Sequence, residues 1–173
     1  MKKRLAVIVA TLALLVLGCG IGYSQGQMSP RPMPQFTATA SNGQTVSSAS
    51  LKGKVLIIDF WATWCPPCRK EIPGFISLQK KYGARGLQVI GFSTDEGKAE
   101  HDSFVKSNGF NYPSVMVNTP KTVNIAKAFE NIIGESSGIP TTLVVNRHGQ
   151  IVYKHVGYAP PETFEGIIVP LLK

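Results

Sequence analysis

The centre of the chain constrains the fold most strongly, because it has the pattern of a strand, a helix and a second strand. Val55–Phe60 is a nearly all-apolar run, as expected for a strand that is buried on both faces of a sheet, and Leu87–Phe92 is another. Between them, apolar side chains recur at helical spacing, at Ile72, Phe75, Ile76 and Tyr82. Lys80-Lys81 followed by Gly83 predicts the end of this helix. Two such strands joined by a helix form a βαβ unit, so they are expected to be parallel.

The other segments predict further strands and helices around this unit. Asn42-Gly43 lies between two short runs and predicts a hairpin of residues Phe36–Ala40 and Gln44–Ser47. Beyond the central unit, helices are predicted at Gly97–Ser107, Val123–Phe129 and from Pro160-Pro161 onward, and strands at Ser114–Val117, Thr141–Val145 and Gln150–Val156. The order predicts an α/β fold in which a central mixed β-sheet is flanked by helices, with an N-terminal β-hairpin and a βαβ-type insertion.

Two of the three cysteines in this 173-residue chain, Cys65 and Cys68, follow the first buried strand directly. A C-x-x-C motif beside a βαβ pattern is typical of a dithiol–disulfide redox centre. One helical turn also gives two cysteines the Cα separation that a disulfide requires. The spacing therefore predicts a redox pair that needs no cofactor.

Three other uses of the cysteine pair fit less well. A zinc site needs about four ligands, but the chain has no second cysteine pair and its three histidines are scattered. Haem attachment requires a histidine directly after the second cysteine, where this chain has Arg69. A purely structural disulfide across two residues closes a very small loop and adds little stability. No metal site is predicted.

Cys65 is expected at the N-terminus of the helix, where free backbone N–H groups and the helix dipole stabilise a thiolate. Pro66 and Pro67 suit the first helical turn, whose N–H groups are unpaired in any case. Because neither proline has an N–H group, the backbone N–H of Cys68 is the nearest remaining donor to the Cys65 sulfur. The residue before a proline favours an extended backbone, which suits an N-cap.

The N-terminal segment, residues 1–22, has the plan of an export signal. Basic residues at positions 2–4 precede the apolar run Leu5–Leu17, and residues 5–22 carry no charge. Three interpretations stay open: a lipoprotein signal with Cys19 as the acylated residue, an uncleaved membrane anchor, or a signal cleaved at the Gly22-Tyr23-Ser24 pattern. All three place the rest of the chain outside the cytoplasm, in the periplasm or cell envelope, where disulfides can form.

Residues 23–34 contain three prolines and are predicted to be an extended linker that does not join the packed core. The folded domain is accordingly predicted over residues 35–173. The net charge of +8 includes the three basic residues at positions 2–4. No clustered basic stripe with base-reading groups follows, so nucleic-acid binding is not predicted.

The stretch Val55–Pro73 resembles the active-site strand and helix of the thioredoxin fold. Its segment Phe60-Trp-Ala-Thr-Trp-Cys-Pro-Pro-Cys-Arg-Lys-Glu-Ile-Pro73 is similar to the motif of extracytoplasmic TlpA/ResA-like thiol–disulfide oxidoreductases. Gly138-Ile-Pro-Thr-Thr142 resembles the loop that bears the cis-proline of that family. The resemblance covers about residues 34–173 and implies a thioredoxin-like fold.

The resemblance also implies roles for individual residues. Cys65 would be the attacking thiol and Cys68 the resolving one. Pro140 would be cis and lie beside the cysteines, and the backbone of Ile139 would bind a substrate strand. Trp64 would flank the active site.

Two acidic residues are further candidates. Asp59 stands in an apolar strand, where burial without a partner should raise its pKa and make it a proton acceptor for Cys68. Its position matches the buried aspartate of thioredoxin, whereas many TlpA-like sequences have asparagine there. Glu71 matches an active-site glutamate of ResA-like proteins, and a solvated helix residue is the open alternative.

The leading functional prediction is an exported thiol–disulfide oxidoreductase, monomeric and tethered to the membrane through its N-terminus. The resemblance implies that it reduces protein disulfides, for instance in apocytochrome c, and is recharged by a membrane thiol–disulfide electron donor. The alternatives are a disulfide oxidase or isomerase, a peroxiredoxin-like peroxidase and a non-catalytic peptide-binding module. The peroxidase is disfavoured because Ala62 stands where its chemistry requires threonine, and the intact Cys65/Cys68 pair argues against the binding module.

Overall fold

The computed structural model describes residues 26–134 and 138–173. Cys19 and the predicted export segment, residues 1–22, lie outside the described residues. In chain order the elements are β1 (Gln27–Pro32), β2 (Thr37–Thr39), β3 (Thr45–Ser47), β4 (Val55–Trp61), α2 (Pro66–Tyr82), β5 (Leu87–Ser93), α3 (Lys98–Ser107), β6 (Ser114–Met116), α4 (Val123–Ile133), β7 (Thr141–Val145), β8 (Gln150–Val156) and α5 (Pro161–Leu171). The predicted strands and helices are all present, and α4 continues past its predicted end at Phe129.

Within the described residues, one sheet has six strands in the order β1-β8-β7-β4-β5-β6, and β2 and β3 form a separate hairpin. Strand β4 is parallel to β5, from the pair Val55 and Leu87 to the pair Trp61 and Ser93. Strand β6 is also parallel to β5, whereas β7, β8 and β1 are antiparallel to their neighbours. The central sheet is therefore mixed, as predicted.

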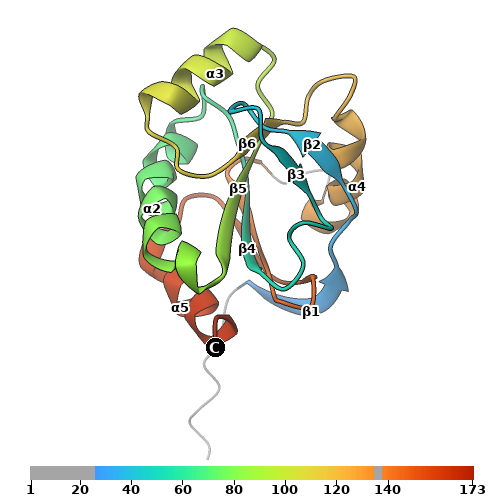
Figure 1. The fold of residues 1–173 in the computed structure, drawn as a ribbon, viewed down its shortest axis with the longest axis vertical. Helices are drawn as coiled ribbons and strands as arrows, with labels where there is room; N and C mark the ends of the chain where they lie inside the picture. The colour runs from blue at the N-terminus through green and yellow to red at the C-terminus, as the bar shows by residue number, and fades with distance from the viewer. Residues whose placement is uncertain (1–25, 135–137) are drawn as a thin grey trace, which may run out of the picture.

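The sheet has a different cover on each face (Figure 1). Ile57 of β4 lies in the same apolar cluster as Phe75 of α2, together with residues of α5. The next residue, Ile58, points the other way, into a cluster with Phe36 before the hairpin and Phe129 of α4. Helices α2 and α5 thus cover one face, and α4 and the hairpin cover the other.

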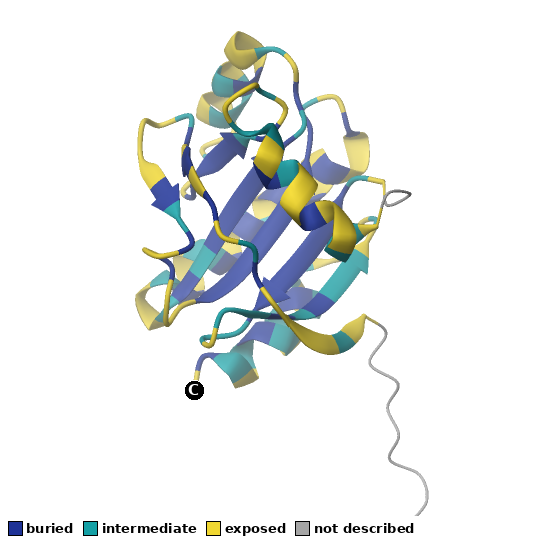
Figure 2. Ribbon diagram, turned by 90° about the vertical axis from the view of Figure 1, so that its right-hand side faces the viewer, coloured by how far each residue is buried: buried dark blue, intermediate teal, exposed yellow. Residues whose placement is uncertain are grey.

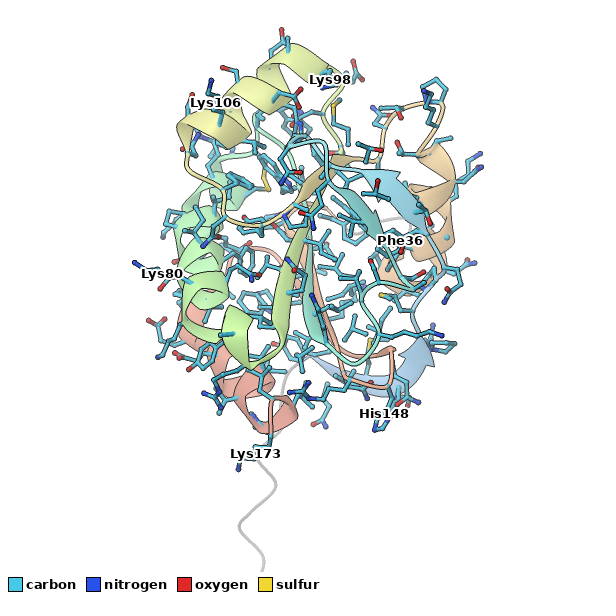
Figure 3. All side chains as sticks on the ribbon, viewed as in Figure 1. Phe36, Lys80, Lys98, Lys106, His148 and Lys173 are labelled. Carbon is cyan, nitrogen blue, oxygen red and sulfur yellow. A yellow bond between two sulfur atoms is a disulfide. The ribbon has the colours of Figure 1, made fainter. Side chains whose placement is uncertain are left out.

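The exposed surface follows from this layering. In Figure 2 the central strands of the sheet are buried behind α4, whose outer side is exposed. Figure 3 shows Phe36 inside the molecule and Lys80 and Lys106 at its periphery. In the part of the chain that the structure describes, no helix combines the length and the apolar character needed to cross a membrane.

The predicted linker at residues 23–34 is wrong for its second half. Residues 27–32 form β1, which pairs antiparallel with β8 at the edge of the sheet, and Met33 is buried in the core. The prolines are compatible with this position because an edge strand needs backbone donors on one side only. The packed domain therefore begins before residue 35.

The predicted end of α2 is confirmed, because Gly83 is its C-cap. Gly83 has right-handed helical angles, and a short 3-10 helix, Gly83–Arg85, follows α2 before the chain turns. The left-handed residue that turns the chain into β5 is Gly86, with φ of 99°. A residue with a side chain would be strained there, which explains the second glycine.

Candidate active site

The two predicted redox cysteines lie at the start of α2, immediately after the loop that leaves β4. Cys65 is the N-cap residue, with the extended backbone that its position before a proline predicts. Cys65 and Cys68 form a disulfide with a Cα separation of 5.3 Å. The backbone N–H of Cys68 donates to the Cys65 sulfur at 3.3 Å, as the sequence predicts.

The two cysteines differ in their surroundings. Cys68 has no exposed surface and lies on the buried side of α2. Cys65 keeps a small exposed fraction, and its neighbour Trp64 is 67% exposed. Trp61, the other tryptophan of this segment, is fully buried. Trp64 is therefore the tryptophan that flanks the disulfide at the surface.

The loop before β7 lies against Cys65. The Ile139–Pro140 peptide bond is cis, as predicted. The carbonyl oxygen of Ile139 lies 3.7 Å from the Cys65 sulfur. The backbone N–H of Gly157 donates to the Pro140 carbonyl at 2.8 Å, and the Thr141 hydroxyl donates to the Gly138 carbonyl at 2.6 Å. These two bonds hold the backbone of Ile139 beside the disulfide.

Asp59 is buried in the middle of the sheet, between Gly91 of β5 and Thr142 of β7. Burial raises the pKa of Asp59 well above its usual range, and the nearby Glu71 raises it further. Neither of its oxygens makes a hydrogen bond of normal geometry to a described residue, although the Thr142 hydroxyl is near enough to offset part of the shift. The prediction of a buried aspartate with a raised pKa is confirmed.

Glu71 lies on the same buried side of α2 as Cys68, three residues further along the helix. Its Oε1 accepts a hydrogen bond from the backbone N–H of Ala159 at 2.7 Å, and its Oε2 has no partner among the described residues. Burial raises the pKa of Glu71 to about 7, and the bond from Ala159 limits the shift. The alternative of a solvated helix residue is wrong, because Glu71 is 3% exposed.

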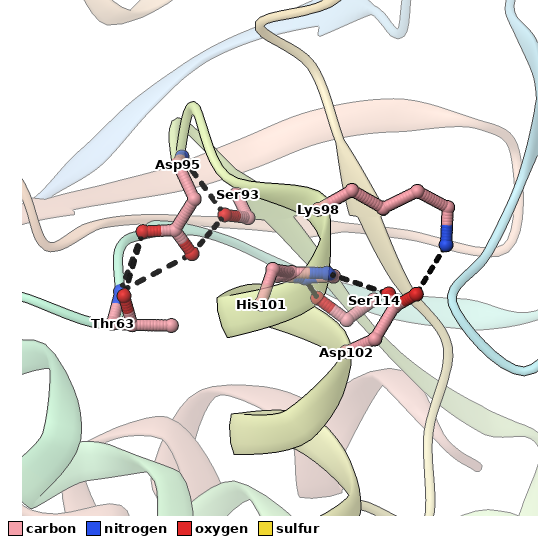
Figure 4. Close-up of polar contacts among 7 residues, drawn as sticks. All are labelled: Thr63, Ser93, Asp95, Lys98, His101, Asp102 and Ser114. Atoms are coloured by element: carbon pink, nitrogen blue, oxygen red, sulfur yellow. Dashed lines mark hydrogen bonds and ion pairs between the residues drawn. The ribbon is translucent and has the colours of Figure 1, made fainter.

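A third buried carboxylate, Asp95, supports the loop before Cys65 (Figure 4). The sequence analysis did not identify it. Its Oδ1 accepts from the Thr63 backbone N–H at 3.0 Å and from the Thr63 hydroxyl at 2.9 Å. Its Oδ2 accepts from the Ser93 hydroxyl at 2.7 Å. A sequence signal for this contact exists, since Asp95 follows β5 and the carboxyl ends of parallel neighbours meet at one edge of the sheet.

A second polar network is built on α3 (Figure 4), whose His101 and Phe104 rings pack against Trp61. His101 of α3 lies with its Nε2 2.9 Å from the Ser114 hydroxyl and its Nδ1 3.2 Å from Asp102. Asp102 also pairs with Lys98. The contact between His101 and Ser114 joins α3 to β6, and the His101 ring packs against the indole ring of Trp61.

Exposed apolar side chains lie on or beside the segments that form the site. Besides Trp64, the large apolar side chains with the greatest exposure in the described parts of the chain are Val156 and Tyr158. Val156 pairs with Thr141, directly after the cis-proline, and the Lys70 ammonium lies 4.2 Å from the centre of the Tyr158 ring. The sequence analysis missed Val156 and Tyr158, because nothing in a local pattern places the end of β8 next to α2.

Comparison with known proteins agrees with this geometry. Residues 30–154 match the family described as AhpC/TSA. The chain belongs to this family. It is 31% identical over 161 residues to the thiol-disulfide oxidoreductase ResA of Bacillus subtilis (strain 168), a match that covers 88% of this chain and 86% of that protein. ResA of one Bacillus cereus strain is 30% identical over 175 residues, or 96% of each protein.

Solved structures give the same result. A thiol:disulfide interchange protein of the thioredoxin family from Chlorobium tepidum TLS superimposes with a TM-score of 0.76 and 37% identity, over 84% of this chain and 99% of that one. A putative thiol:disulfide interchange protein DsbE from Chlorobium tepidum has a TM-score of 0.72 and 26% identity, over 85% and 99%. The protein is a thiol–disulfide oxidoreductase of the thioredoxin-like AhpC/TSA family.

Proposed function

We propose that this oxidoreductase reduces disulfides of client proteins outside the cytoplasm, with Cys65 as the attacking thiol and Cys68 as the resolving thiol. The observation that carries this proposal is the asymmetry of the pair. Cys65 caps a helix beside the exposed Trp64, whereas Cys68 is fully buried with Glu71 on the same side of α2. A client sulfur can approach the Cys65 thiol, and the nearby acidic groups can accept the proton of the Cys68 thiol.

The helix N-terminus supports Cys65 as the nucleophile. The Cys68 backbone N–H and the positive end of the helix dipole stabilise a thiolate at this position. In the first step the Cys65 thiolate attacks one client sulfur. A Cys65–client disulfide forms, the client disulfide breaks, and the other client sulfur leaves as a thiolate.

The buried carboxyl groups serve the second step. Cys68 transfers its thiol proton to the ionised Asp59–Glu71 pair and attacks the Cys65 sulfur as a thiolate. The Cys65–Cys68 disulfide forms again, and the second client sulfur leaves as a thiolate. The client has gained two electrons and the protein has lost two, so a dithiol donor must reduce the pair before the next cycle.

The surface around Cys65 would hold the client. A client strand would bond to the backbone of Ile139 beside the cis-Pro140 and lay apolar side chains on Trp64. This arrangement is supported by the exposure of Trp64 and by the short distance between the Ile139 carbonyl and Cys65.

The export signal supports the proposed location. Residues 1–22 would carry the chain out of the cytoplasm and leave it tethered, with Cys19 acylated or embedded in the membrane. A membrane dithiol protein would then recharge the pair, and apocytochrome c would be one client. Mass spectrometry of the mature N-terminus tests the tether, because a lipid mass on Cys19 supports acylation and an intact Met1 contradicts both cleaved forms.

Insulin reduction with a small dithiol as electron source tests the roles of the two cysteines. Cys65→Ala should abolish activity, and Cys68→Ala should accumulate a mixed disulfide with the client. Retained activity in Cys65→Ala would overturn the proposal. A redox titration of the pair tests the direction, since a strongly reducing potential supports a reductase and an oxidising one reverses the assignment.

Asp59→Asn tests the proton acceptor. The variant should resolve the mixed disulfide about tenfold or more slowly, and its pH profile should change, because a general base has been removed. Glu96→Gln is the control, because Glu96 is an exposed acid in the segment that follows the neighbouring strand β5. A pH profile of Asp59→Asn that matches the wild type would remove Asp59 from the mechanism.

A further inference from the structure

Several buried polar atoms without partners lie on the side of the sheet that α2 covers. Among the described residues, the buried side-chain atoms that lack a hydrogen-bond partner are both oxygens of Asp59, Oε2 of Glu71, the indole nitrogen of Trp61 and the hydroxyls of Tyr112 and Thr142. Buried polar groups in proteins are rarely left unpaired, so a group of them needs an explanation. This group contains acids that can accept a hydrogen bond and hydroxyls that can donate one.

Tyr112 is a member of this group that the proposed mechanism does not use. It lies in the segment between α3 and β6, and its side chain belongs to the apolar cluster under α2. Its ring packs on Phe110 at 4.8 Å between centroids, and the whole residue is buried. Only its hydroxyl lacks a partner, which is unfavourable unless another state of the protein supplies one.

Two contacts bring this segment to Asp59. The side-chain amide of Asn111 donates to the Ile76 carbonyl of α2 at 3.0 Å. The carbonyl of Pro113 accepts from the backbone N–H of Gly91 at 3.0 Å, and Gly91 is the direct neighbour of Asp59 across β4 and β5. The residue between these two anchors is therefore confined between α2 and the strand beside Asp59.

The electrostatics agree with this placement. Burial raises the pKa of Tyr112 well above its usual range, and negative charge on Asp59 and then on Glu71 adds to the shift. Such repulsion acts between groups that lie close together in a poorly solvated interior. Tyr112 and the two acids thus form one interacting set.

Other charged or titratable side chains on the surrounding elements have contacts of their own. Arg69 lies over the Phe104 ring and Lys70 over the Tyr158 ring. Tyr82 bonds to Glu165, and His101 contacts Ser114 and Asp102. His155 packs against the Phe164 ring, and no acid contributes to the raised pKa of Tyr153. Cys68 is the remaining titratable group on the buried side of α2 once the disulfide is reduced.

We propose that Tyr112 is a positioning residue for the resolving step, whose hydroxyl donates a hydrogen bond to Asp59 when the acid pair is ionised. The inference rests on the proposed role of the acid pair as proton acceptor for Cys68. Tyr112 keeps its own proton throughout. It holds the carboxylate ready to receive the Cys68 proton and favours its ionised form at neutral pH.

Removing this donor has a defined consequence. A hydrogen bond to a charged group stabilises the charged form, so its loss raises the pKa of the carboxyl group. In Tyr112→Phe less of the pair is ionised at a given pH, and the acid limb of the pH profile for resolution should move up by about one pH unit. Resolution should be roughly tenfold slower below the midpoint and unchanged well above it.

The experiment compares Tyr112→Phe with Tyr153→Phe in the full chain. Tyr153 is a second buried tyrosine of the same apolar cluster, and its pKa is raised by burial alone, with no contribution from the acids. Release of thiol from a preformed mixed disulfide is followed from acid to alkaline pH, and the Asp59 and Glu71 carboxyl carbons are titrated by NMR in the reduced protein. The proposal expects Tyr112→Phe to shift both readouts upward and Tyr153→Phe to shift neither.

The two readouts separate this proposal from the proposed function. If the carboxyl titrations are the same in Tyr112→Phe and the wild type, or if Tyr153→Phe moves them as far, the role of Tyr112 is overturned even when insulin is still reduced. If the wild type reduces no insulin, the proposed function fails, and the NMR titration still shows whether Tyr112 interacts with the acids.

Discussion

Asp59 and Asp95 are buried carboxylates in segments that converge near Cys65, but their surroundings are opposite. Asp95 accepts hydrogen bonds from the Thr63 N–H, the Thr63 hydroxyl and the Ser93 hydroxyl. Asp59 accepts none of normal geometry from the described residues. Full hydrogen bonding offsets the cost of burying a charge, whereas burial without hydrogen bonds raises the pKa of a carboxyl group, so that it binds a proton more readily. The difference separates a carboxylate that supports the loop from one that can exchange a proton.

The strongest effect is expected for Asp95, which supports the loop before Cys65. Asp95→Ala leaves the Thr63 N–H and the Ser93 hydroxyl without an acceptor, so the free energy of unfolding should fall by about 2–4 kcal/mol. Urea unfolding measures the change, and Glu96→Ala, an exposed neighbour, is the control. A loss no greater than that of the control would show that Asp95 does not support the loop.

The next effect is on the pH dependence of stability. The pKa of Glu71 is raised from 4.5 to about 7 on folding, so the folded protein binds the proton more tightly than the unfolded chain. The contribution of Glu71 to the free energy of unfolding is therefore fully present below pH 4.5 and is lost as the pH rises to about 7. In Glu71→Gln the free energy of unfolding should fall by about 2–3 kcal/mol less over this pH range than in the wild type.

Chemical unfolding of Glu71→Gln at several pH values between about 4 and 8 checks this prediction. Glu162→Gln, an exposed acid at the start of α5, should keep the slope of the wild type. If the slope of stability against pH is the same in Glu71→Gln and the wild type, the Glu71 carboxyl group is in contact with water. The contrast between the Asp59–Glu71 pair and Asp95 would then be lost.

The weakest effect concerns Cys65, which lies between the two regions. The Thr63 N–H is bonded to Asp95, and Pro66 and Pro67 have no N–H, so the Cys68 N–H is the donor that reaches the Cys65 sulfur. Pro66→Gly adds an amide in the first turn and should lower the Cys65 thiol pKa by less than about one unit. Thiolate absorbance against pH measures it, and no change or a rise would contradict the prediction.

Much of the site could be predicted because its signals are local. A buried strand, a C-x-x-C motif and a helical run lie next to one another in the chain, and Cys65 as N-cap follows from the prolines after it. An acid inside an apolar strand is likewise conspicuous, so Asp59 could be predicted to be buried with a raised pKa. The cis-Pro140 required the family resemblance as well.

The missed features depend on contacts between distant segments. Residues 27–32 look like a linker because their prolines are read locally, and their pairing with β8 lies far away in the chain. For the same reason Tyr158 and Tyr112 carry no local signal, and the position of Asp95 after β5 does not show which loop it contacts. Each acquires a role from a contact with a distant segment: Asp95 from the loop before Cys65, Tyr158 from helix α2, and Tyr112 from the strand beside Asp59.

Thiol spacing, hydrophobic period and proline positions act over a few residues, so the redox chemistry and the α/β order of elements follow from the amino-acid sequence alone. The pairing of the buried acids does not follow from it, and it became known only from the folded chain. A carboxyl group is solvated, bonded or isolated according to what surrounds it in space. For Asp59, Glu71 and Asp95 those surroundings come from other strands, helices and loops.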